Sequence, residues 1–238
     1  MKTIVAARLL PILALAALSA CGREDSAADT ESVAEDAVEA PAPSADYRFT
    51  EGEHFLRFDS PQPTVGDDGR IEVSEVFWYG CHHCANLEAP LNAWVAEAPD
   101  TVRFERIPAT WNQTAIAHAQ IFYTIELLSS NGAIDDYHAV HAGVFEAIHK
   151  RGIRLLRLEE IEAFFADFGV DSATFNDTWN SAEVAESLRV ANELARSYRI
   201  EAVPTLVIGG QYKTTTALAR NELFSVVDEL IEREEAAL

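Results

Sequence analysis

The chain has 238 residues, and its 39 acidic side chains outnumber the 18 basic ones, so that the formal net charge is −21. A surface this acidic argues against binding DNA or RNA through phosphates and against electrostatic adhesion to anionic lipid. We therefore expect no nucleic-acid partner, and we expect any membrane attachment to depend on a lipid anchor.

The first 20 residues are typical of a secretory signal peptide. Lys2 and Arg8 form a short positive region, and the apolar run at 9–18 is too short to span a bilayer, which takes about 20 helical residues. The following LSAC, Leu18 to Cys21, resembles the lipobox of bacterial lipoproteins. This resemblance implies cleavage before Cys21, lipid on its sulfur and amino group, and a membrane anchor. The alternative is an ordinary signal peptide that leaves a free Cys21.

Residues 21–46 are rich in alanine, serine, proline and acidic residues, and they include no aromatic residue. Such a segment cannot bury enough apolar surface to offset the cost of ordering the chain. We predict a disordered acidic tether here. The folded domain then occupies residues 47–238, which is long enough for one domain that carries an insertion.

The folded part begins with a predicted βαβ unit. A leading edge strand is expected at His54–Phe58, and a largely buried strand at Ile71–Trp78, where β-branched and aromatic residues stand close together. The sequence CHHC, Cys81 to Cys84, then begins a helix whose apolar residues recur at helical spacing. Pro90 lies inside that helix and is expected to kink it. Thr101–Pro108 is predicted to be the next strand.

From about Thr114 to Arg199 the pattern is helical almost throughout. Asn131-Gly132, Gly152 and Gly169 separate the candidate pieces, and Asp171 or Ser172 could cap the short fourth one. The pieces are 114–129, 134–149, 158–168, 173–179 and 183–198.

The C-terminal part is predicted to be a β-hairpin and a helix. Thr205–Ile208 reads as a buried strand, Gly209-Gly210 as a two-residue turn, and Gln211–Lys213 as the return strand. The final helix is indicated by one apolar stripe, made of Leu223, Val226, Val227, Leu230 and Ile231.

This order of elements predicts an α/β protein with a thioredoxin fold, a central mixed β-sheet flanked by helices. A βαβ half and a ββα half are separated by the helical stretch. We therefore predict an all-helical domain inserted at about residues 112–188 of the thioredoxin domain.

The CHHC sequence has the spacing of a redox pair. Positions i and i+3 of a helix share a face, so Cys81 and Cys84 converge as a disulfide requires, while His82 and His83 splay outward. Unpaired amides and the helix dipole favour negative charge at a helix start, so the pKa of Cys81 should be lowered. A protonated histidine nearby would lower it further, although either histidine could simply cover the surface.

A stabilised thiolate favours the reduced protein, which makes the disulfide easy to give away. We expect the exposed Cys81 to exchange with substrate and the deeper Cys84 to resolve the mixed disulfide. A structural or chance pair of cysteines is one alternative, and a zinc site is another. In the zinc alternative, His138 and His141 would complete a Cys2His2 tetrahedron, although histidines on an apolar helix face are more often core residues, and we expect no metal.

These motifs are similar to those of a known protein family. From about Tyr47 to the C-terminus it resembles the DsbA family of periplasmic thiol:disulfide oxidoreductases, in EVFWYGCHHC, in VFEAIHKRG at Val144–Gly152, and in VPTLVIGG. The resemblance implies oxidation of cysteines in newly exported proteins, without a cofactor. It also implies a DsbB-like, quinone-linked membrane enzyme that reoxidises the dithiol.

The resemblance also assigns site residues. Pro204 should follow a cis peptide bond and face the two cysteines, with Val203 offering its backbone to an extended substrate; a trans proline that opens a strand is the alternative. Glu75 matches the family's buried acid, which could shuttle the proton of Cys84, and Arg106 matches a basic position and would pair with it. An outward-facing Glu75 is the alternative.

Two features depart from the family pattern. His82 stands where proline is common, and it restores an amide donor and adds a possible charge, both of which lean towards an oxidising couple. Gly22 after Cys21 is not the aspartate associated with inner-membrane retention, so the inner or outer membrane is left undecided.

The leading hypothesis is therefore an exported, lipid-anchored enzyme of the periplasm that donates the Cys81–Cys84 disulfide. A disulfide isomerase or reductase of the same fold is the alternative, but isomerases typically carry a dimerisation domain, which is not visible here. Without such an element we expect a monomer. A non-catalytic, substrate-binding lipoprotein and a zinc-binding lipoprotein are the remaining alternatives.

Overall fold

The computed structural model describes residues 47–216, 218–219 and 221–237. The predicted signal peptide, the lipidation of Cys21 and the acidic tether fall in residues 1–46 and lie outside the described residues. Among the helices of the described part, none is both long and apolar enough to cross a bilayer.

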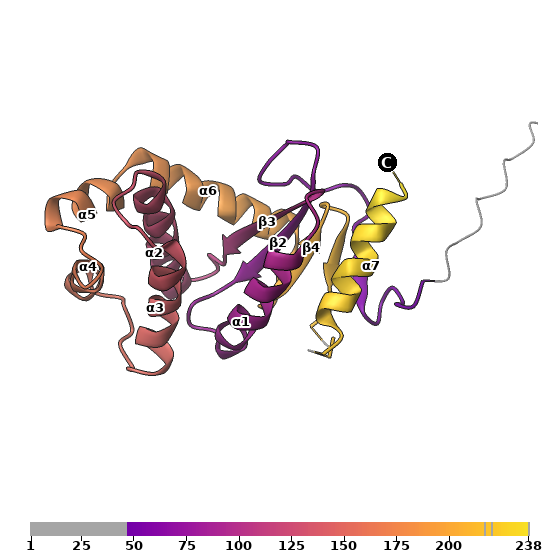
Figure 1. Ribbon diagram of the computed structural model, residues 1–238, viewed down its shortest axis with the longest axis horizontal. Coiled ribbons are helices and arrows are strands. Elements are labelled where there is room, and N and C mark those ends of the chain that lie inside the picture. Colours follow the sequence, from indigo (N-terminus) through magenta and orange to yellow (C-terminus); the bar gives the residue numbers. More distant parts are fainter. Residues whose placement is uncertain (1–46, 217, 220, 238) are drawn as a thin grey trace, which may run out of the picture. The chain divides into compact units, whose positions relative to one another are not determined.

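The strands form one mixed five-stranded sheet in the order β1-β5-β4-β2-β3, and Figure 1 shows β2 between β3 and β4. β2 runs parallel to β3, and the other neighbouring pairs are antiparallel. This confirms the thioredoxin arrangement and the edge position of the first strand. The strands are β1 (Phe55–Arg57), β2 (Ile71–Phe77), β3 (Val102–Pro108), β4 (Thr205–Ile208) and β5 (Tyr212–Thr214).

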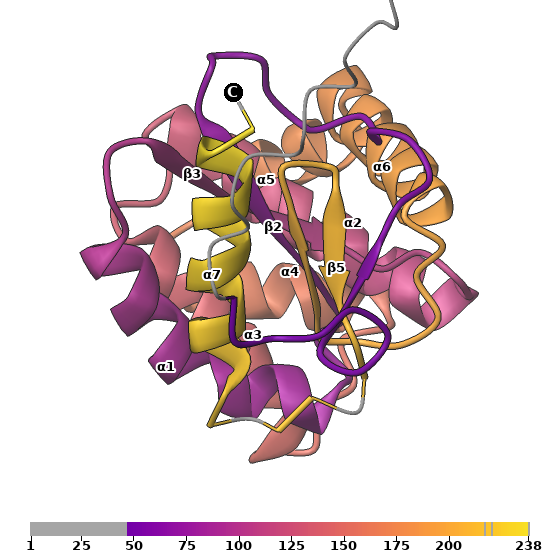
Figure 2. The ribbon, with the colours of Figure 1, turned by 90° about the vertical axis from the view of Figure 1, so that its right-hand side faces the viewer.

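β2 leads directly to the cysteines and is buried along its whole length. Its side chains alternate between the two faces of the sheet, as a strand requires. Val73 packs with α1 (His82–Glu97) and α7 (Leu223–Glu235), whereas Val76 packs with α6 (Ala182–Ser197). Figure 2 shows the sheet between these helices, with α1 and α7 on one face and α6 on the other.

α1 begins at His82 and continues through Pro90 to Glu97. Pro90 lies exposed, while Leu87 and Leu91 on either side of it are buried. A proline inside a helix costs roughly 3 kcal/mol, and burial of the apolar side chains of this helix offsets that cost.

Four helices follow β3 and precede α6: α2 (Gln113–Ser130), α3 (Tyr137–His149), α4 (Leu158–Ala166) and α5 (Ser172–Trp179). The predicted cap of α5 is confirmed, because the Asp171 carboxylate accepts hydrogen bonds from the amides of Ala173 and Thr174. α3 begins at Tyr137, whereas the prediction placed its start at Ile134. The reason is a local cap: the Asp136 side chain accepts from the amide of Ala139 and starts the helix there.

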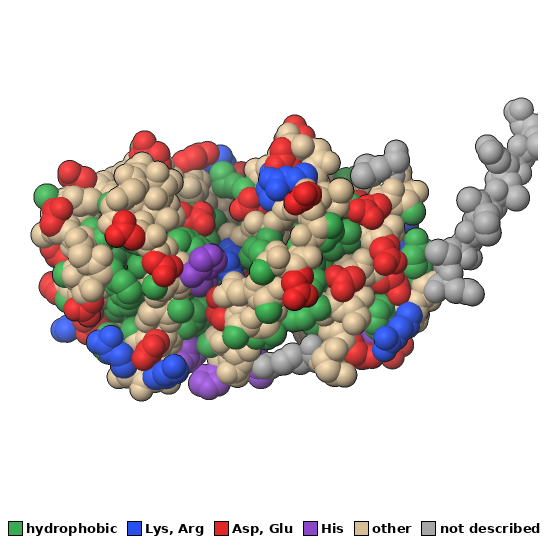
Figure 3. All heavy atoms as spheres, in the orientation of Figure 1, with side chains coloured by type: hydrophobic (Ala, Val, Ile, Leu, Met, Phe, Trp, Pro, Cys, Tyr) green, Lys and Arg blue, Asp and Glu red, His purple; other side chains and the backbone are tan. Residues whose placement is uncertain are grey.

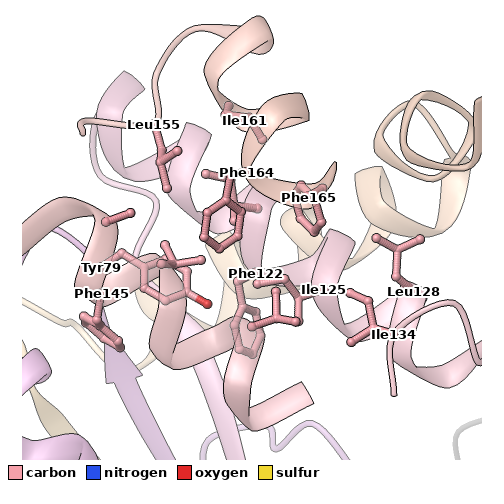
Figure 4. Close-up of a cluster of buried hydrophobic side chains, with 14 of the residues drawn as sticks. Tyr79, Phe122, Ile125, Leu128, Ile134, Phe145, Leu155, Ile161, Phe164 and Phe165 are labelled. Atoms are coloured by element: carbon pink, nitrogen blue, oxygen red, sulfur yellow. The ribbon is translucent and has the colours of Figure 1, made fainter. Parts of the chain in front are cut away.

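A cluster of buried apolar side chains joins these helices to the sheet (Figure 4). Tyr79, which follows β2, lies beside Phe145 of α3, with the two ring centroids 4.8 Å apart. The cluster extends through Phe122 and Phe165, both fully buried, and it includes Cys84. The helical part and the strand that leads to the cysteines therefore share one core.

The hairpin at the C-terminal half differs from the prediction in one respect. Both glycines of the turn have positive φ, +56° at Gly209 and +65° at Gly210, which explains the residue type. However, Ile208 pairs with Tyr212, so the loop has three residues, including Gln211, where two were predicted. The Gln211 carbonyl accepts from the amide of Phe58, which follows β1. The return strand therefore starts at Tyr212, one residue later than predicted.

Acidic side chains are spread over the face of the molecule seen in Figure 3, with fewer basic ones among them. Histidine side chains lie in the middle of this face and at its lower edge. The distribution agrees with the net charge of −21 and gives this face no continuous basic surface for nucleic acid.

Candidate active site

The two thiols lie at the start of α1, directly after the buried strand. Cys81 is the N-cap residue and is half-buried, whereas Cys84 lies in the first turn with 0% of its surface exposed. Both are free thiols in this structure. Sγ of Cys81 lies 3.4 Å from the carbonyl oxygen of Val203, to which it donates a hydrogen bond only while it is protonated. The two sulfurs therefore differ sharply in their access to solvent.

The pKa of Cys81 is lowered from 9.0 to about 5. The largest cause is the hydrogen bond from the Cys84 side chain, which outweighs the opposing effect of partial burial. The backbone amides of Cys84 and His83, and the charge of His83, act in the same direction. At neutral pH the accessible sulfur is therefore a thiolate.

Cys84 behaves in the opposite way. Burial raises the pKa of Cys84 far above its ordinary value, and its hydrogen bond to Cys81 and the nearby charge of Glu75 raise it further. Cys84 consequently keeps its proton while Cys81 is ionised, so one sulfur of the pair is a nucleophile and the other a thiol.

The two histidines between the cysteines have different surroundings, although both lie exposed. His83 contributes its charge and its backbone amide to lowering the pKa of Cys81. The ring of His82 instead lies against α3, where its Nδ1 is 3.0 Å from Nδ1 of His149. The sequence pattern treated the two histidines as equivalent, and the structure separates them.

Glu75 has 0% of its surface exposed and lies close enough to the two cysteines for electrostatic interaction with both. It stands opposite Arg106 in the β2–β3 register, and Arg106 Nε lies 3.5 Å from its Oε2. Burial raises the pKa of Glu75 to about 8, and the charge of Glu88 adds to this effect while Arg106 opposes it. The pairing of Glu75 with Arg106 is confirmed, and the outward-facing alternative is wrong. The proton-shuttle role of Glu75 stays a prediction.

A further set of buried and half-buried polar groups was not predicted. The Tyr79 hydroxyl lies 2.7 Å from Nδ1 of His141, and Nε2 of His141 lies 3.2 Å from a carboxylate oxygen of Glu88. The same oxygen lies 3.4 Å from the Arg106 guanidinium, the partner of Glu75. Glu88 follows Cys84 by four residues and shares its helix face, which is a usable sequence signal. No sequence spacing connects His141 to this group.

The zinc alternative is not supported by the placement of its ligands. His141 is buried against Tyr79 and Glu88, whereas His138 is exposed and contacts the ring of Tyr137. Over residues 47–216, 218–219 and 221–237, no three histidine, cysteine or acidic side chains are grouped as metal ligands. The two histidines therefore do not complete a tetrahedron with the cysteines.

The loop before β4 faces the cysteines. The Val203–Pro204 peptide bond is cis, as predicted. A cavity of about 420 Å³ opens beside this loop, a volume within the usual range for a binding pocket. It is lined by His83, Leu87, Ala202, Val203, Pro204, Thr214, Thr215, Thr216, Leu218 and Leu223.

Comparison with known proteins agrees with this geometry. Residues 72–226 match the family described as DSBA-like thioredoxin domain. The chain is 38% identical over 191 residues to the thiol:disulfide interchange protein DsbA of Pseudomonas aeruginosa, covering 79% of this chain and 87% of the relative. It is 37% identical over 188 residues to the protein of the same name in Pseudomonas syringae pv. tomato, covering 78% and 85%.

Solved structures are similar to this chain as well. The crystal structure of Pseudomonas aeruginosa DsbA matches with a TM-score of 0.72 and 38% identity, covering 79% of this chain and 96% of that one. The structure of the oxidoreductase DsbA from Xylella fastidiosa matches with a TM-score of 0.71 and 30% identity, covering 79% and 98%.

Proposed function

The chain belongs to the DSBA-like thioredoxin domain family and is a thiol:disulfide oxidoreductase, and we propose that it works as an oxidase that donates the Cys81–Cys84 disulfide to exported proteins. The observation that carries this proposal is the lowered pKa of Cys81, about 5. A thiolate that is stable at neutral pH stabilises the reduced protein and so makes its disulfide a strong oxidant.

The reaction proceeds in two exchanges. A substrate thiolate attacks Sγ of Cys81, the bond between Cys81 and Cys84 breaks, and the Cys84 sulfur leaves with the electron pair. A second substrate thiolate then attacks the substrate sulfur of the mixed disulfide and releases Cys81 as a thiolate. The substrate loses two electrons and becomes a disulfide, and the protein gains them as a dithiol.

Glu75 has a place in the first exchange. The raised pKa of Cys84 means that this sulfur must take a proton as it leaves. A carboxyl whose own pKa is about 8 is protonated in part at neutral pH and lies close enough to influence Cys84. We therefore assign Glu75 as the acid that protonates the leaving Cys84, with His83 supporting the Cys81 thiolate.

Substrate binding is assigned to the loop with Val203 and Pro204. The Val203 carbonyl lies within hydrogen-bond reach of Cys81, so an extended substrate chain that pairs with this backbone would bring its own sulfur to the reactive one. The adjoining cavity of about 420 Å³ would take side chains that flank the substrate cysteine.

The test is the equilibrium with glutathione as a function of pH. When the protein oxidises two glutathione molecules, Cys81 is left as a thiolate and one proton is released. The equilibrium constant for donation should therefore rise about tenfold per pH unit from about pH 5 to the ordinary thiol range near pH 8.5. Below pH 5 no proton is released and the constant should level off.

A constant that stays flat from pH 5 to 8 would contradict the proposal, because it means that Cys81 ionises like an ordinary thiol. Poor donation together with efficient rescue of scrambled disulfides would favour the isomerase alternative. A reduced peptide that is not oxidised at all, by the protein with or without Cys81, would favour a non-catalytic binding protein.

We further propose the setting in which the enzyme works. It acts in the periplasm as a monomer, on newly exported proteins with reduced cysteines, and a DsbB-like quinone-linked membrane enzyme takes the two electrons from its dithiol. The domain limits that fit this setting are 1–20 for the signal peptide, 21–46 for the tether and 47–238 for the folded domain, with the helical insertion at about 112–188.

Membrane attachment through lipid on Cys21 completes the proposal, supported by the LSAC sequence alone. Mass spectrometry of the mature N-terminus should find diacylglycerol on the Cys21 sulfur and an acyl chain on its amino group. Cys21→Ser should move the protein from the membrane fraction to the soluble one. An unmodified N-terminus at another residue would overturn the lipid anchor and leave the oxidase proposal standing.

A further inference from the structure

His149, the last residue of α3, reaches the turn that carries Cys81. Its Nε2 lies 2.7 Å from the carbonyl oxygen of Tyr79, two residues before Cys81. Its Nδ1 lies 3.0 Å from Nδ1 of His82, the residue directly after Cys81. One imidazole of the helical part therefore contacts the chain on both sides of the reactive cysteine.

These contacts determine which ring nitrogens carry protons. A carbonyl oxygen only accepts, so Nε2 of His149 must be the donor to Tyr79. In a neutral His149 ring, Nδ1 is then an acceptor, and the hydrogen bond between the rings requires His82 to donate from its own Nδ1. Both hydrogen bonds thus depend on one particular tautomer of each ring.

The pair can hold one additional proton without losing either bond. Protonation of His82 at Nε2 leaves its Nδ1–H donating to His149. Protonation of both rings would place two N–H groups against each other and break the contact. The two rings meet at close to a right angle, 78° between planes with centroids 4.8 Å apart, which agrees with an in-plane lone pair receiving the proton.

Packing holds His149 in this place. Its ring stacks on Phe145, with 23° between planes, and Phe145 in turn packs on the ring of Tyr79. The titratable groups near the pair are Cys81 and His83 at the start of α1, and His118 of α2, whose pKa is lowered by burial and to a smaller extent by His149. His149 itself is only half-buried.

We propose that His149 is a positioning residue for the redox pair: by holding the Tyr79 carbonyl and the His82 ring, it keeps the first turn of α1 in the geometry that supports the Cys81 thiolate. This inference rests on the oxidase function proposed above. It gives the helical insertion a direct part in the chemistry, because α3 then sets the stability of the reduced form.

The direction of the effect follows from the reduced state. The amides of His83 and Cys84 lower the pKa of Cys81 only while the first turn of α1 is in place. In the oxidised protein the disulfide itself holds that turn. Loss of His149 should therefore weaken the reduced form more than the oxidised form, so that the variant is the poorer oxidant.

Three variants test this. His149→Phe keeps a ring but removes both hydrogen bonds, and its equilibrium constant for oxidising glutathione should fall about threefold to tenfold, where tenfold corresponds to about 30 mV. The Cys81 thiolate, followed by its ultraviolet absorbance, should titrate at higher pH. His149→Gln offers an amide donor and an acceptor and should restore most of the loss. The exposed His138→Gln, on the same helix, should change neither measurement.

The tautomers are tested in the wild-type protein without any turnover. Long-range ¹⁵N–¹H spectra at neutral pH should show His82 protonated at Nδ1 and His149 protonated at Nε2. In His149→Phe the preference of His82 for Nδ1 should disappear. A failure of the wild type to oxidise thiols would contradict the oxidase function but would leave this readout intact.

Three outcomes would overturn the inference. One is a His82 ring that carries its proton on Nε2 in the wild type. Another is a His149→Phe variant that folds and keeps its glutathione equilibrium and thiolate titration within a factor of two of the wild type. The third is a metal ion between the rings, found by elemental analysis of the purified protein, because the metal would replace the hydrogen bond. If His149→Phe does not fold, His149→Gln and the wild-type spectra still decide the matter.

Discussion

Glu75 is held in the interior of the fold, with the Arg106 guanidinium 3.5 Å away and Glu88 as a second, partly buried acid nearby. Burial raises its pKa from 4.5 to about 8. The folded protein therefore keeps a proton on this group over a pH range in which the unfolded chain has released it. Such an acid adds stability at low pH and loses that contribution as the pH rises through its folded pKa.

Replacing Glu75 with leucine should stabilise the reduced protein. Arg106 retains Glu88 and Asn92 as partners, so the variant removes a poorly solvated acid without isolating the cation. The free energy of unfolding should exceed that of the wild type by about 1 to 3 kcal/mol near pH 8. The difference should shrink towards zero as the pH falls from about 8 to 4.5.

Urea denaturation of both reduced proteins across this pH range provides the measurement. If the difference in unfolding free energy between the two proteins stays constant from pH 4.5 to 8, Glu75 does not titrate with a raised pKa. Disulfide donation by the variant should become slower, because the leaving Cys84 loses its proton donor, while the equilibrium with glutathione should change less than the rate.

The helix α6 ends at a residue other than glycine that has a left-handed backbone. Arg199 lies directly after Tyr198, the C-cap residue of α6, at φ +49°, and there the Ile200 amide closes the helix by donating to the Ala195 carbonyl. This is the position at which glycine is preferred, because its lack of a Cβ removes the steric penalty of positive φ. The helix therefore ends here through its hydrogen bonds and in spite of its residue type.

Arg199→Gly should stabilise the protein. Removing the penalty of a left-handed side chain gains about 1 to 2 kcal/mol, and the greater freedom of glycine in the unfolded chain offsets part of it. We expect a net gain of about 0.5 to 1 kcal/mol, which raises the melting temperature by about 2 °C. Calorimetry of the oxidised protein measures this.

Arg196→Gly is the matched control. Arg196 lies in the last turn of the same helix and is also exposed, but its backbone is helical. The same substitution should here lower the stability by about 1 kcal/mol. Two changes of the same sign would mean that loss of the arginine side chain, and not the backbone conformation, controls the outcome.

At the scale of the whole molecule, the helical insertion and the redox site are one structure. Phe77 and Tyr79 from the strand side, and Cys84 from α1, lie in the same buried cluster as the helices α2 to α5. One continuous core favours a single cooperative unfolding transition. The insertion is thus expected to be a cooperative part of the enzyme that cannot melt separately.

Phe165→Ala tests this cooperativity from a residue of α4, in the helical insertion. Phe165 is fully buried, and truncation of a buried phenylalanine costs about 3 to 5 kcal/mol. In urea, the loss of helical circular dichroism and the exposure of Cys84 to a thiol reagent should occur in one transition, shifted together to lower urea. Leu158→Ala, at a position 43% exposed in the same helix, should change the stability by no more than about 0.5 kcal/mol.

Separate transitions for the two probes would contradict a shared core, as would a Phe165→Ala variant in which the helices melt while Cys84 stays protected. Both outcomes would place the redox site on an independently stable thioredoxin part.

Local patterns in the sequence were sufficient for the fold and for the identity of the reactive groups. The strand at Ile71, the CHHC sequence at the following helix start, and the apolar stripe of the last helix are each contained in a few consecutive residues. The periodicity of strands and helices depends on residues that are close together in the sequence, and so does the effect of a helix start on a thiol. Both can therefore be predicted from the sequence. Glu75 and Pro204 came from the family resemblance.

The tertiary structure alone decided how the two histidines of the CHHC sequence differ. Their order along the chain is symmetrical between the cysteines, but α3 returns across the start of α1 and brings His149 to His82, while His83 lies by Cys81. The tertiary structure also decided that His141 lies beside Glu88. It decided as well that β5 starts later than predicted, where the carbonyl of the preceding Gln211 accepts from the amide of Phe58, which follows β1. Each of these depends on a contact between segments far apart in the sequence, and no local spacing encodes which distant side chain will arrive.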